Sequence, residues 1–370
     1  MSLRHESSYY NGAPGQTNTN RLFVPTAADI ETFGEYGLFD PRLIGKPDDI
    51  LSHEIAYNPS GIYTIPPNAL DNPTNLPIDV MYVRVEPNRV DSGVSHLGKT
   101  VSRPYIVDLK NPSAPLLPFH GGMELRGEDP SLLRINRRSP VSGKTEQVWL
   151  VSVVNAQPNP DKPYEVASVD TDIYVGESLG NLQKVAQGPP GMKDIRFAVD
   201  ANPDSTKLHV WGRPQPRSGT GNVNYLTVPD ISKLTPDSIA QAPLIHPELF
   251  PEEKGAWGGV NDAFLVGVGK YVLASHRAWM TGEDDSGRHY EACLFGHDTS
   301  TGRIVDLGVI ATADMFPGLT VKDDTTVDLH DVVFTGGGYN GKPALLTFGV
   351  GDGSIGIGNL QRKPPTLRSV

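Results

Sequence analysis

The stretch RGEDPSLLRI, residues 126–135, places two adjacent carboxylates and a proline directly before a run of apolar residues. Asp is depleted in strands, and proline cannot donate a hydrogen bond to a sheet ladder. We therefore expect Glu128 and Asp129 to lie at the entry of a buried strand, outside it, with Pro130 at its first position. From there a carboxylate can project into the space that the end of the strand faces.

Strand-like segments of this kind recur along the chain. They are short, rich in Val, Leu, Ile and aromatic residues, and bounded by Gly, Pro, Asn or Asp. Helical periodicity is confined to residues 230–242, where Pro236 limits it to one or two turns. The sequence therefore predicts an all-β protein. The expected strands lie at 78–86, 103–110, 130–135, 147–154, 170–177, 195–200, 207–213, 223–228, 262–268, 270–276, 290–298, 331–338 and 343–351.

A carboxylate also recurs beside successive groups of strands, at intervals of 43 to 69 residues. A four-stranded propeller blade needs about 40–50 residues, and more with insertions. Five such groups predict a five-bladed β-propeller whose innermost strands direct these acids into a central cavity. The alternative is that each acid is a turn residue, favoured at strand ends for local hydrogen bonding. The recurring acids are Glu86, Asp129, Asp194, Asp262 and Asp331.

Composition limits the possible partners. The chain of 370 residues has 32 Lys and Arg against 43 Asp and Glu, a net charge of −11 that disfavours nucleic acid and anionic membranes. One cysteine, Cys293, rules out an intrachain disulfide, and no apolar run suggests a signal peptide or a membrane span. We expect a cytoplasmic protein with one catalytic domain at 21–360, a flexible N-terminal tail at 1–20 and a C-terminal tail at 361–370.

Most familiar catalytic motifs are missing. The histidines show no HxH or HExxH spacing, and no GxSxG elbow occurs, so neither a metal nor another cofactor is expected. Carboxylates and cations remain. Lys193 and Arg196 flank Asp194, and alternation in a strand points Asp194 and Arg196 the same way. Arginine suits bidentate contact with phosphate, although each cation can equally be a surface residue or a salt-bridge partner.

Aromatic residues offer platforms for a sugar ring. Trp211 lies inside a strand and is expected in the core, whereas Trp257 lies in the Gly-rich KGAWGGVND and is expected to face a pocket. Trp279 and Tyr290 are further candidates. Paired acids beside a cluster of cations suit inverting glycosyl transfer, in which one acid protonates the bridging oxygen. When phosphate is the nucleophile, cations take the place of a second carboxylate.

Several motifs together resemble a known family. GEDPSLLRI, GPPGMKDIRF, GRPQPRSGTGNVNY, AWGGVNDAFLV, ASHRAW, GRHYEACLFGHD and DLHDVVFTGGG occur in order between about residues 80 and 352. They resemble the family once called domain of unknown function 1861, now glycosyltransferase family 108, the β-1,2-mannan phosphorylase/mannosyltransferases. A more distant similarity connects the Glu-Asp-Pro segment to glycoside hydrolase family 130. The resemblance implies a five-bladed β-propeller and reversible phosphorolysis of β-1,2-linked mannosides to α-mannose 1-phosphate.

The resemblance also implies roles for individual residues. Asp129 would be the general acid, acting directly or through a sugar hydroxyl, and Glu128 would bind the sugar in the donor subsite. The implied partners are a mannose-containing oligosaccharide with inorganic phosphate or mannose 1-phosphate. The phosphate site would comprise Lys193, Arg196, Arg213, His276 and His289. The other candidate substrate-binding residues are Glu86, Asp194, Trp257, Asn261, Asp262, Tyr290, Asp328 and Asp331.

Two departures from the family pattern bear on specificity. The chain has GGVND where GGxNE is expected, so Asp262 is one methylene shorter, and it has SHRA where GHIA is expected, which adds Arg277. The N-terminal ~75 residues match no pattern and are candidates for a closing strand or a lid. A β-mannoside hydrolase on the same fold and a non-catalytic carbohydrate-binding propeller remain alternatives.

Overall fold

The computed structural model describes residues 36–87, 99–159, 161, 166–214, 222–245, 256–281, 287–322 and 328–362. Strands dominate these residues, which confirms the all-β prediction. The strands are β1 (Tyr36–Leu43), β2 (Glu54–Pro59), β3 (Tyr63–Ile65), β4 (Ile78–Pro87), β5 (Val101–Ile106), β6 (Leu117–Pro118), β7 (Leu125–Arg126), β8 (Glu128–Arg138), β9 (Thr145–Pro158), β10 (Val166–Gly176), β11 (Gln183–Gln187), β12 (Met192–Val199), β13 (Leu208–Pro214), β14 (Asn224–Val228), β15 (Trp257–Gly267), β16 (Lys270–Thr281), β17 (Gly287–Asp298), β18 (Arg303–Ala311), β19 (Asp328–Tyr339), β20 (Lys342–Val350) and β21 (Ser354–Arg362).

Helical structure is short where it occurs. The segment predicted to hold one or two turns forms the 3-10 turn η1 (Ile231–Lys233) and helix α3 (Pro236–Ala240), which begins at Pro236 because proline is tolerated in a first turn. A second 3-10 turn, η4 (Ala313–Met315), precedes β19. In the part of the chain that the structure describes, no helix has the length and apolar character needed to cross a membrane.

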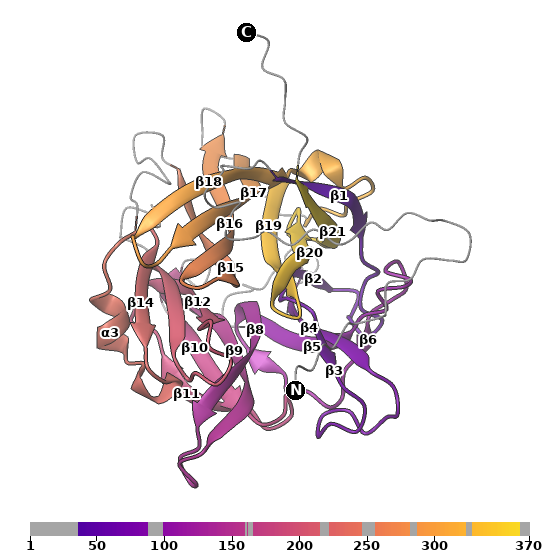
Figure 1. The fold of residues 1–370 in the computed structure, drawn as a ribbon. Coiled ribbons are helices and arrows are strands. Elements are labelled where there is room, and N and C mark those ends of the chain that lie inside the picture. The colour runs from indigo at the N-terminus through magenta and orange to yellow at the C-terminus, as the bar shows by residue number, and fades with distance from the viewer. Residues whose placement is uncertain are drawn as a thin grey trace.

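The described strands pair into four hydrogen-bonded sheets. Two are the antiparallel groups β8–β11 and β12–β14, and a third joins β2 and β4–β6 with β3 and β7 beside them. The largest combines the antiparallel groups β15–β18 and β19–β21 through a parallel contact between β17 and β19. Figure 1 shows these groups arranged in chain order around a common centre, with β2, β8, β12, β15 and β19 nearest to it. The division into five blades stays a prediction.

The N-terminal part of the described chain completes the sheet that contains the last strand. β1 pairs antiparallel with β21, so that Leu38 lies opposite Leu360. Tyr36 and Leu360 are fully buried in a hydrophobic cluster with Phe348 and Val350. Residues separated by most of the chain therefore form one edge of the structure. The predicted tail at 1–20 lies outside the described residues, and β21 continues two residues past the expected boundary at 360.

The strands nearest the centre share a local irregularity. In each, one extra residue interrupts the pairing with the next strand of its group and forms a β-bulge. Bulges re-aim side chains and are common near active sites. Asn58, Asp129 and Asp194 occupy such positions with φ of 45°, 50° and 48°, a left-handed conformation that Asn and Asp tolerate better than other side chains. The bulges lie at Asn58, Asp129–Pro130, Asp194–Ile195, Asn261 and Gly336–Gly337.

One expectation for the opening stretch was wrong. Glu128 and Asp129 are the first residues of β8, and Pro130 is the third. The strand tolerates them because register shifts between Glu128 and Ser131, which removes Asp129 and Pro130 from the regular ladder. The proline therefore forfeits no pairing, and the Asp129 side chain leaves the alternation of the strand.

The seam between β1 and β21 makes a testable contribution to stability. Replacing buried Tyr36 with Ala leaves a cavity and is expected to lower the free energy of unfolding by about 3 kcal/mol or more. Phe39→Ala, on the same strand but 49% exposed, is the matched control and should cost far less. Urea unfolding of both variants measures the difference. Equal losses would show that β1 contributes little packing.

Candidate active site

Charged side chains from several strands converge where the bulged strands meet. Arg84 on β4 donates to the Asp129 Oδ1 atom at 3.1 Å and forms an ion pair with Glu128 Oε2 at 2.8 Å. It also donates to Glu86 Oε2 at 2.8 Å, and the Asn58 amide donates to Asp129 Oδ1 at 2.8 Å. All of these residues are buried. The two acids of the opening stretch are thus fixed by partners from β2 and β4.

The cations predicted for an anion site lie on the other side of the two acids. Lys193 forms an ion pair with Glu128 Oε1 at 3.0 Å. Arg196 donates to Asp194 Oδ1 and to the Asp129 carbonyl oxygen, both at 2.9 Å, so Asp194 and Arg196 are in contact as predicted, although the β-bulge at Asp194–Ile195 interrupts the strand alternation between them. Arg213 on β13 lies 3.1 Å from the second Asp194 oxygen. These three cations therefore contact two carboxylates, Glu128 and Asp194, and the backbone of Asp129, across β8, β12 and β13.

His276 extends this network to β15 and β16. Arg213 donates to His276 Nε2 at 2.8 Å, so the imidazole proton lies on Nδ1 and is donated to Asn261 Oδ1 at 3.0 Å. Burial and the positive charge of Arg213 hold the pKa of His276 well below its usual value. The ring is therefore neutral, and both of its nitrogens are occupied by protein groups.

Three buried N–H groups of this network lack an acceptor among the described residues. They are Asn261 Nδ2, Arg196 Nε and Arg213 Nε, on side chains that are 1%, 1% and 6% exposed. A buried donor without a partner costs roughly 1–3 kcal/mol, so such groups call for an explanation. All three belong to the cluster that also holds Lys193. Each of the three groups can donate a hydrogen bond to an oxygen atom of a bound ligand.

Electrostatics keep Asp129 ionised in this arrangement. Burial alone would raise the pKa of Asp129, but the charges of Arg84 and Lys193, the hydrogen bond from Asn58 and the charge of Arg196 outweigh burial and lower the pKa below its usual value. Lys193 stays protonated because Glu128 raises its pKa against the effect of burial. The resting site therefore holds a carboxylate at Asp129.

Glu86 and Asp262, both predicted to bind substrate, are hydrogen-bonded to other groups of the protein. Glu86 accepts from Tyr57 at 2.8 Å, and from Arg84 and Lys322. Asp262 accepts from the backbone amides of Ala263 at 2.8 Å and Gly338 at 3.1 Å, which joins β15 to β19. Burial raises the pKa of Asp262 to about 7, although these two hydrogen bonds and Arg196 lower it.

An aromatic wall adjoins His276. The Tyr290 ring stacks on His276 at 5.5 Å and 6°, and the Trp257 ring meets Tyr290 edge-on at 5.7 Å and 83°. Ala278 on β16 is paired with Trp257 on β15 and with Tyr290 on β17. Ala278 lies two residues from His276 on the same strand, so the side chains of these residues share one face of the sheet. Trp211 is fully buried in the core, as predicted.

His289, Asp331 and Asp328 lie apart from the cluster. Trp279 and His289 are opposite each other on the face that His276 does not share, and their rings are 3.9 Å apart. His289 also contacts Asp331, whose side chain is 53% exposed. Asp328 is exposed and accepts from His330. None of these contacts joins the three residues to Asp129 or Arg196, and their place in the site stays a prediction.

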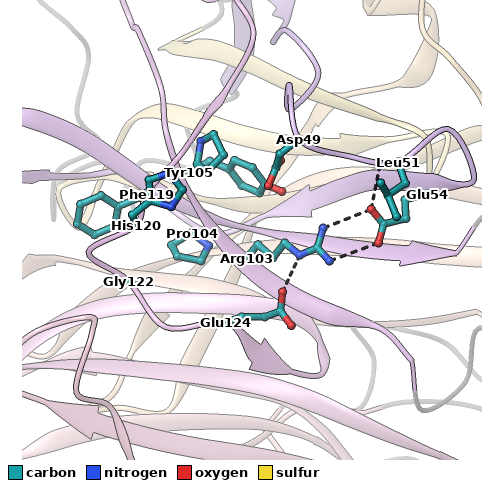
Figure 2. A pocket seen from close by; sticks show the side chains of 11 residues that line it. Asp49, Leu51, Glu54, Arg103, Pro104, Tyr105, Phe119, His120, Gly122 and Glu124 are labelled. Atoms are coloured by element: carbon teal, nitrogen blue, oxygen red, sulfur yellow. Dashed lines mark hydrogen bonds and ion pairs between the residues drawn. The ribbon is translucent and has the colours of Figure 1, made fainter.

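A cavity of about 520 Å³ lies elsewhere, beside β5. Figure 2 shows Arg103 there, held between Glu54 and Glu124. Arg103 is paired with Val83 and Arg84 with Ser102, so the two arginines lie on opposite faces of the sheet. None of the predicted site residues lines this cavity. Among the described residues, no three His, Cys, Asp or Glu side chains gather as metal ligands would.

Comparison with known proteins places these observations in a family. The fold is shared with known proteins, since three solved structures each match at least 90% of this chain with TM-scores above 0.6. The chain belongs to the family described as a protein of unknown function, DUF1861, whose model matches residues 134–357. No curated protein matches the chain.

The solved structures establish the shared fold. MPT-4, a mannose phosphorylase from Leishmania mexicana in complex with a phosphate ion, is 22% identical, with a TM-score of 0.67 over 90% of this chain and 91% of that one. MPT-1, a GDP-Man-dependent mannosyltransferase from the same organism, is 22% identical, with a TM-score of 0.66 over 90% and 92%. A hypothetical protein from Leishmania major is 20% identical, with a TM-score of 0.63 over 93% and 96%.

The neutral state of His276 can be tested directly. Because Arg213 donates to Nε2, protonation would require that bond to break, so we expect the imidazole to stay neutral from pH 8 to pH 5. Nitrogen-15 NMR of histidine-labelled protein, assigned with His276→Gln, measures its protonation and tautomer. Titration of His276 near pH 6.5 would contradict the assignment.

Proposed function

We propose that this chain is an inverting phosphorylase or mannosyltransferase that acts on β-1,2-linked mannosides, on a five-bladed β-propeller. Five antiparallel groups of strands, each beginning with a bulged strand near the centre, support the blade count. The observation that carries the function is the set of unpaired donors on Asn261, Arg196 and Arg213, next to the Glu128–Asp129 pair. The fold shared with a mannose phosphorylase whose structure is in complex with a phosphate ion supports this proposal.

In this mechanism, the anion site holds inorganic phosphate against the donors of Arg196, Arg213 and Asn261, with Lys193 adding charge. Asp129, once protonated, gives its proton to the oxygen that bridges two mannose units, and the bond from that oxygen to the anomeric carbon breaks. A phosphate oxygen forms the new bond to that carbon from the opposite face. The products are α-mannose 1-phosphate and the shortened glycan, and Asp129 is left as a carboxylate.

The reverse reaction begins from the ionised Asp129 of the resting site. Asp129 then accepts the proton of an acceptor hydroxyl while that oxygen attacks the anomeric carbon of mannose 1-phosphate, and the bond from that carbon to the phosphate oxygen breaks to release inorganic phosphate. Trp257 and Tyr290 form an apolar wall on the face that His276 shares. An aromatic face of this kind suits the C–H face of a pyranose, and we assign it to the acceptor sugar.

The assigned acid has a decisive test. Wild-type protein with β-1,2-mannobiose and phosphate should release mannose 1-phosphate, and Asp129→Asn should lower kcat by about 100-fold or more while the protein stays folded. Product analysis in the absence of phosphate separates this activity from hydrolysis. Release of free mannose alone would identify a hydrolase. Sugar binding without cleavage by either protein would identify a non-catalytic carbohydrate-binding propeller.

The anion site has a test of its own. Asn261→Asp keeps the acceptor that His276 needs and replaces the unpaired donor with a negatively charged oxygen. We expect phosphate to bind about 100-fold or more weakly, since a like charge facing a ligand costs several kcal/mol. Calorimetric titration with inorganic phosphate measures this. Asn136→Asp, at the far end of β8 where the amide donates to the Pro203 carbonyl, is the control. Unchanged phosphate affinity in Asn261→Asp would place the anion elsewhere.

A further inference from the structure

Arg84 makes contacts that none of the sequence motifs assigned to it. Its guanidinium reaches three carboxylates on two strands: Glu86 on its own strand, and Glu128 and Asp129 on β8. The nitrogen–oxygen distances are 2.8 Å to Glu86, 2.8 Å to Glu128 and 3.1 Å to Asp129. Only the planar, branched guanidinium can donate in these directions at once.

An aromatic ring and a carboxylate hold the guanidinium in place. Its central carbon lies 4.7 Å from the centre of the Tyr57 ring, and the Tyr57 hydroxyl donates to Glu86 at 2.8 Å. Lys322 pairs with the same Glu86. The Arg84 side chain is only 10% exposed. Glu86 and Tyr57 therefore fix Arg84, and Arg84 fixes the two acids ahead of it.

In both hydrogen bonds to the Asp129 carboxylate, the partner is the donor and Asp129 is the acceptor. Oδ1 accepts from the Arg84 guanidinium, which can only donate, and from the NH2 group of the Asn58 amide. Such bonds favour a carboxylate over a carboxylic acid. Glu128, between Arg84 and Lys193, is restrained from both sides.

We propose that Arg84 is a positioning residue that orients the Glu128–Asp129 pair and keeps Asp129 ionised in the resting site. Its consequence for catalysis rests on the proposed function, in which the acid must be protonated for phosphorolysis and ionised for synthesis. Arg84 then sets the pH range over which each direction runs. Other charged groups also act on Asp129 or on its partners. From the packed strands and turns these are Glu86, Glu128, Lys193, Asp194, Arg196, His276, Lys322 and Asp352.

Carboxyl carbon-13 NMR of aspartate-labelled protein tests the proposal without any substrate. The Asp129 signal, assigned with Asp129→Asn, is followed from pH 2.5 to pH 8 in wild type and in Arg84→Gln. Loss of a cation at this distance should move its inflection up by about one pH unit or more. Arg103→Gln, which removes an arginine from the opposite face of the same sheet, should leave it unchanged. An unmoved inflection in Arg84→Gln would overturn the proposal.

Kinetics supply a second measurement. In wild type, kcat/KM for β-1,2-mannobiose at fixed subsaturating phosphate should fall as pH rises past the Asp129 inflection. Arg84→Gln should shift that fall to higher pH, whereas a purely structural role would lower kcat/KM without moving the profile. A wild-type protein without phosphorolysis would refute the proposed function, while the NMR titration would still decide the role of Arg84.

A variant that keeps the positive charge covers the case in which Arg84→Gln fails to fold. In Arg84→Lys the ammonium group is a point charge that cannot reach all three carboxylates. The Asp129 inflection should therefore rise, by less than in Arg84→Gln. A titration identical to wild type in a folded Arg84→Lys protein would show that bridging by the guanidinium is dispensable, which contradicts the proposal.

Discussion

The structure depends on pairing charges that have been removed from water. An isolated buried charge is too costly to keep, so each cation at the centre must lie within reach of a carboxylate and each carboxylate within reach of a donor. Arg84 and Lys193 meet this condition with Glu128 on another strand, and Arg196 and Arg213 meet it with Asp194. The same pairing that stabilises the centre holds the candidate reacting groups in fixed positions.

Strand alternation, applied to the sequence, predicted part of this centre. It placed Asp194 and Arg196 together, and the structure shows them in contact. The same rule applies to Arg84 and Glu86, two residues apart in VRVEP, and would have found the most connected cation of the site. Family resemblance pointed to the acid beside it instead. The all-β class was predictable because short apolar runs and frequent turn residues leave little alternative.

Other features left no signal in the sequence. The register of a bulge depends on the partner strand, so the turn of Asp129 away from its ladder could not be predicted from GEDPS. The neutral state of His276 follows from Arg213, a residue 63 positions away that reaches it only in the folded chain. Lys322, the partner of Glu86, lies in no recognisable motif. His289 shows the converse, since it lies within a matching motif but on the face of its strand that His276 does not share.

The pairing of β1 with β21 affects the order of events during synthesis. A ribosome releases the segment around Tyr36 long before it makes the segment around Leu360, so β1 must wait for its partner while the intervening strands emerge. Until then the nascent chain exposes an unpaired strand edge, and such edges recruit other chains. A polypeptide that stops short of residue 354 never acquires this partner. Complete translation therefore matters more for this chain than for a chain whose paired strands are consecutive.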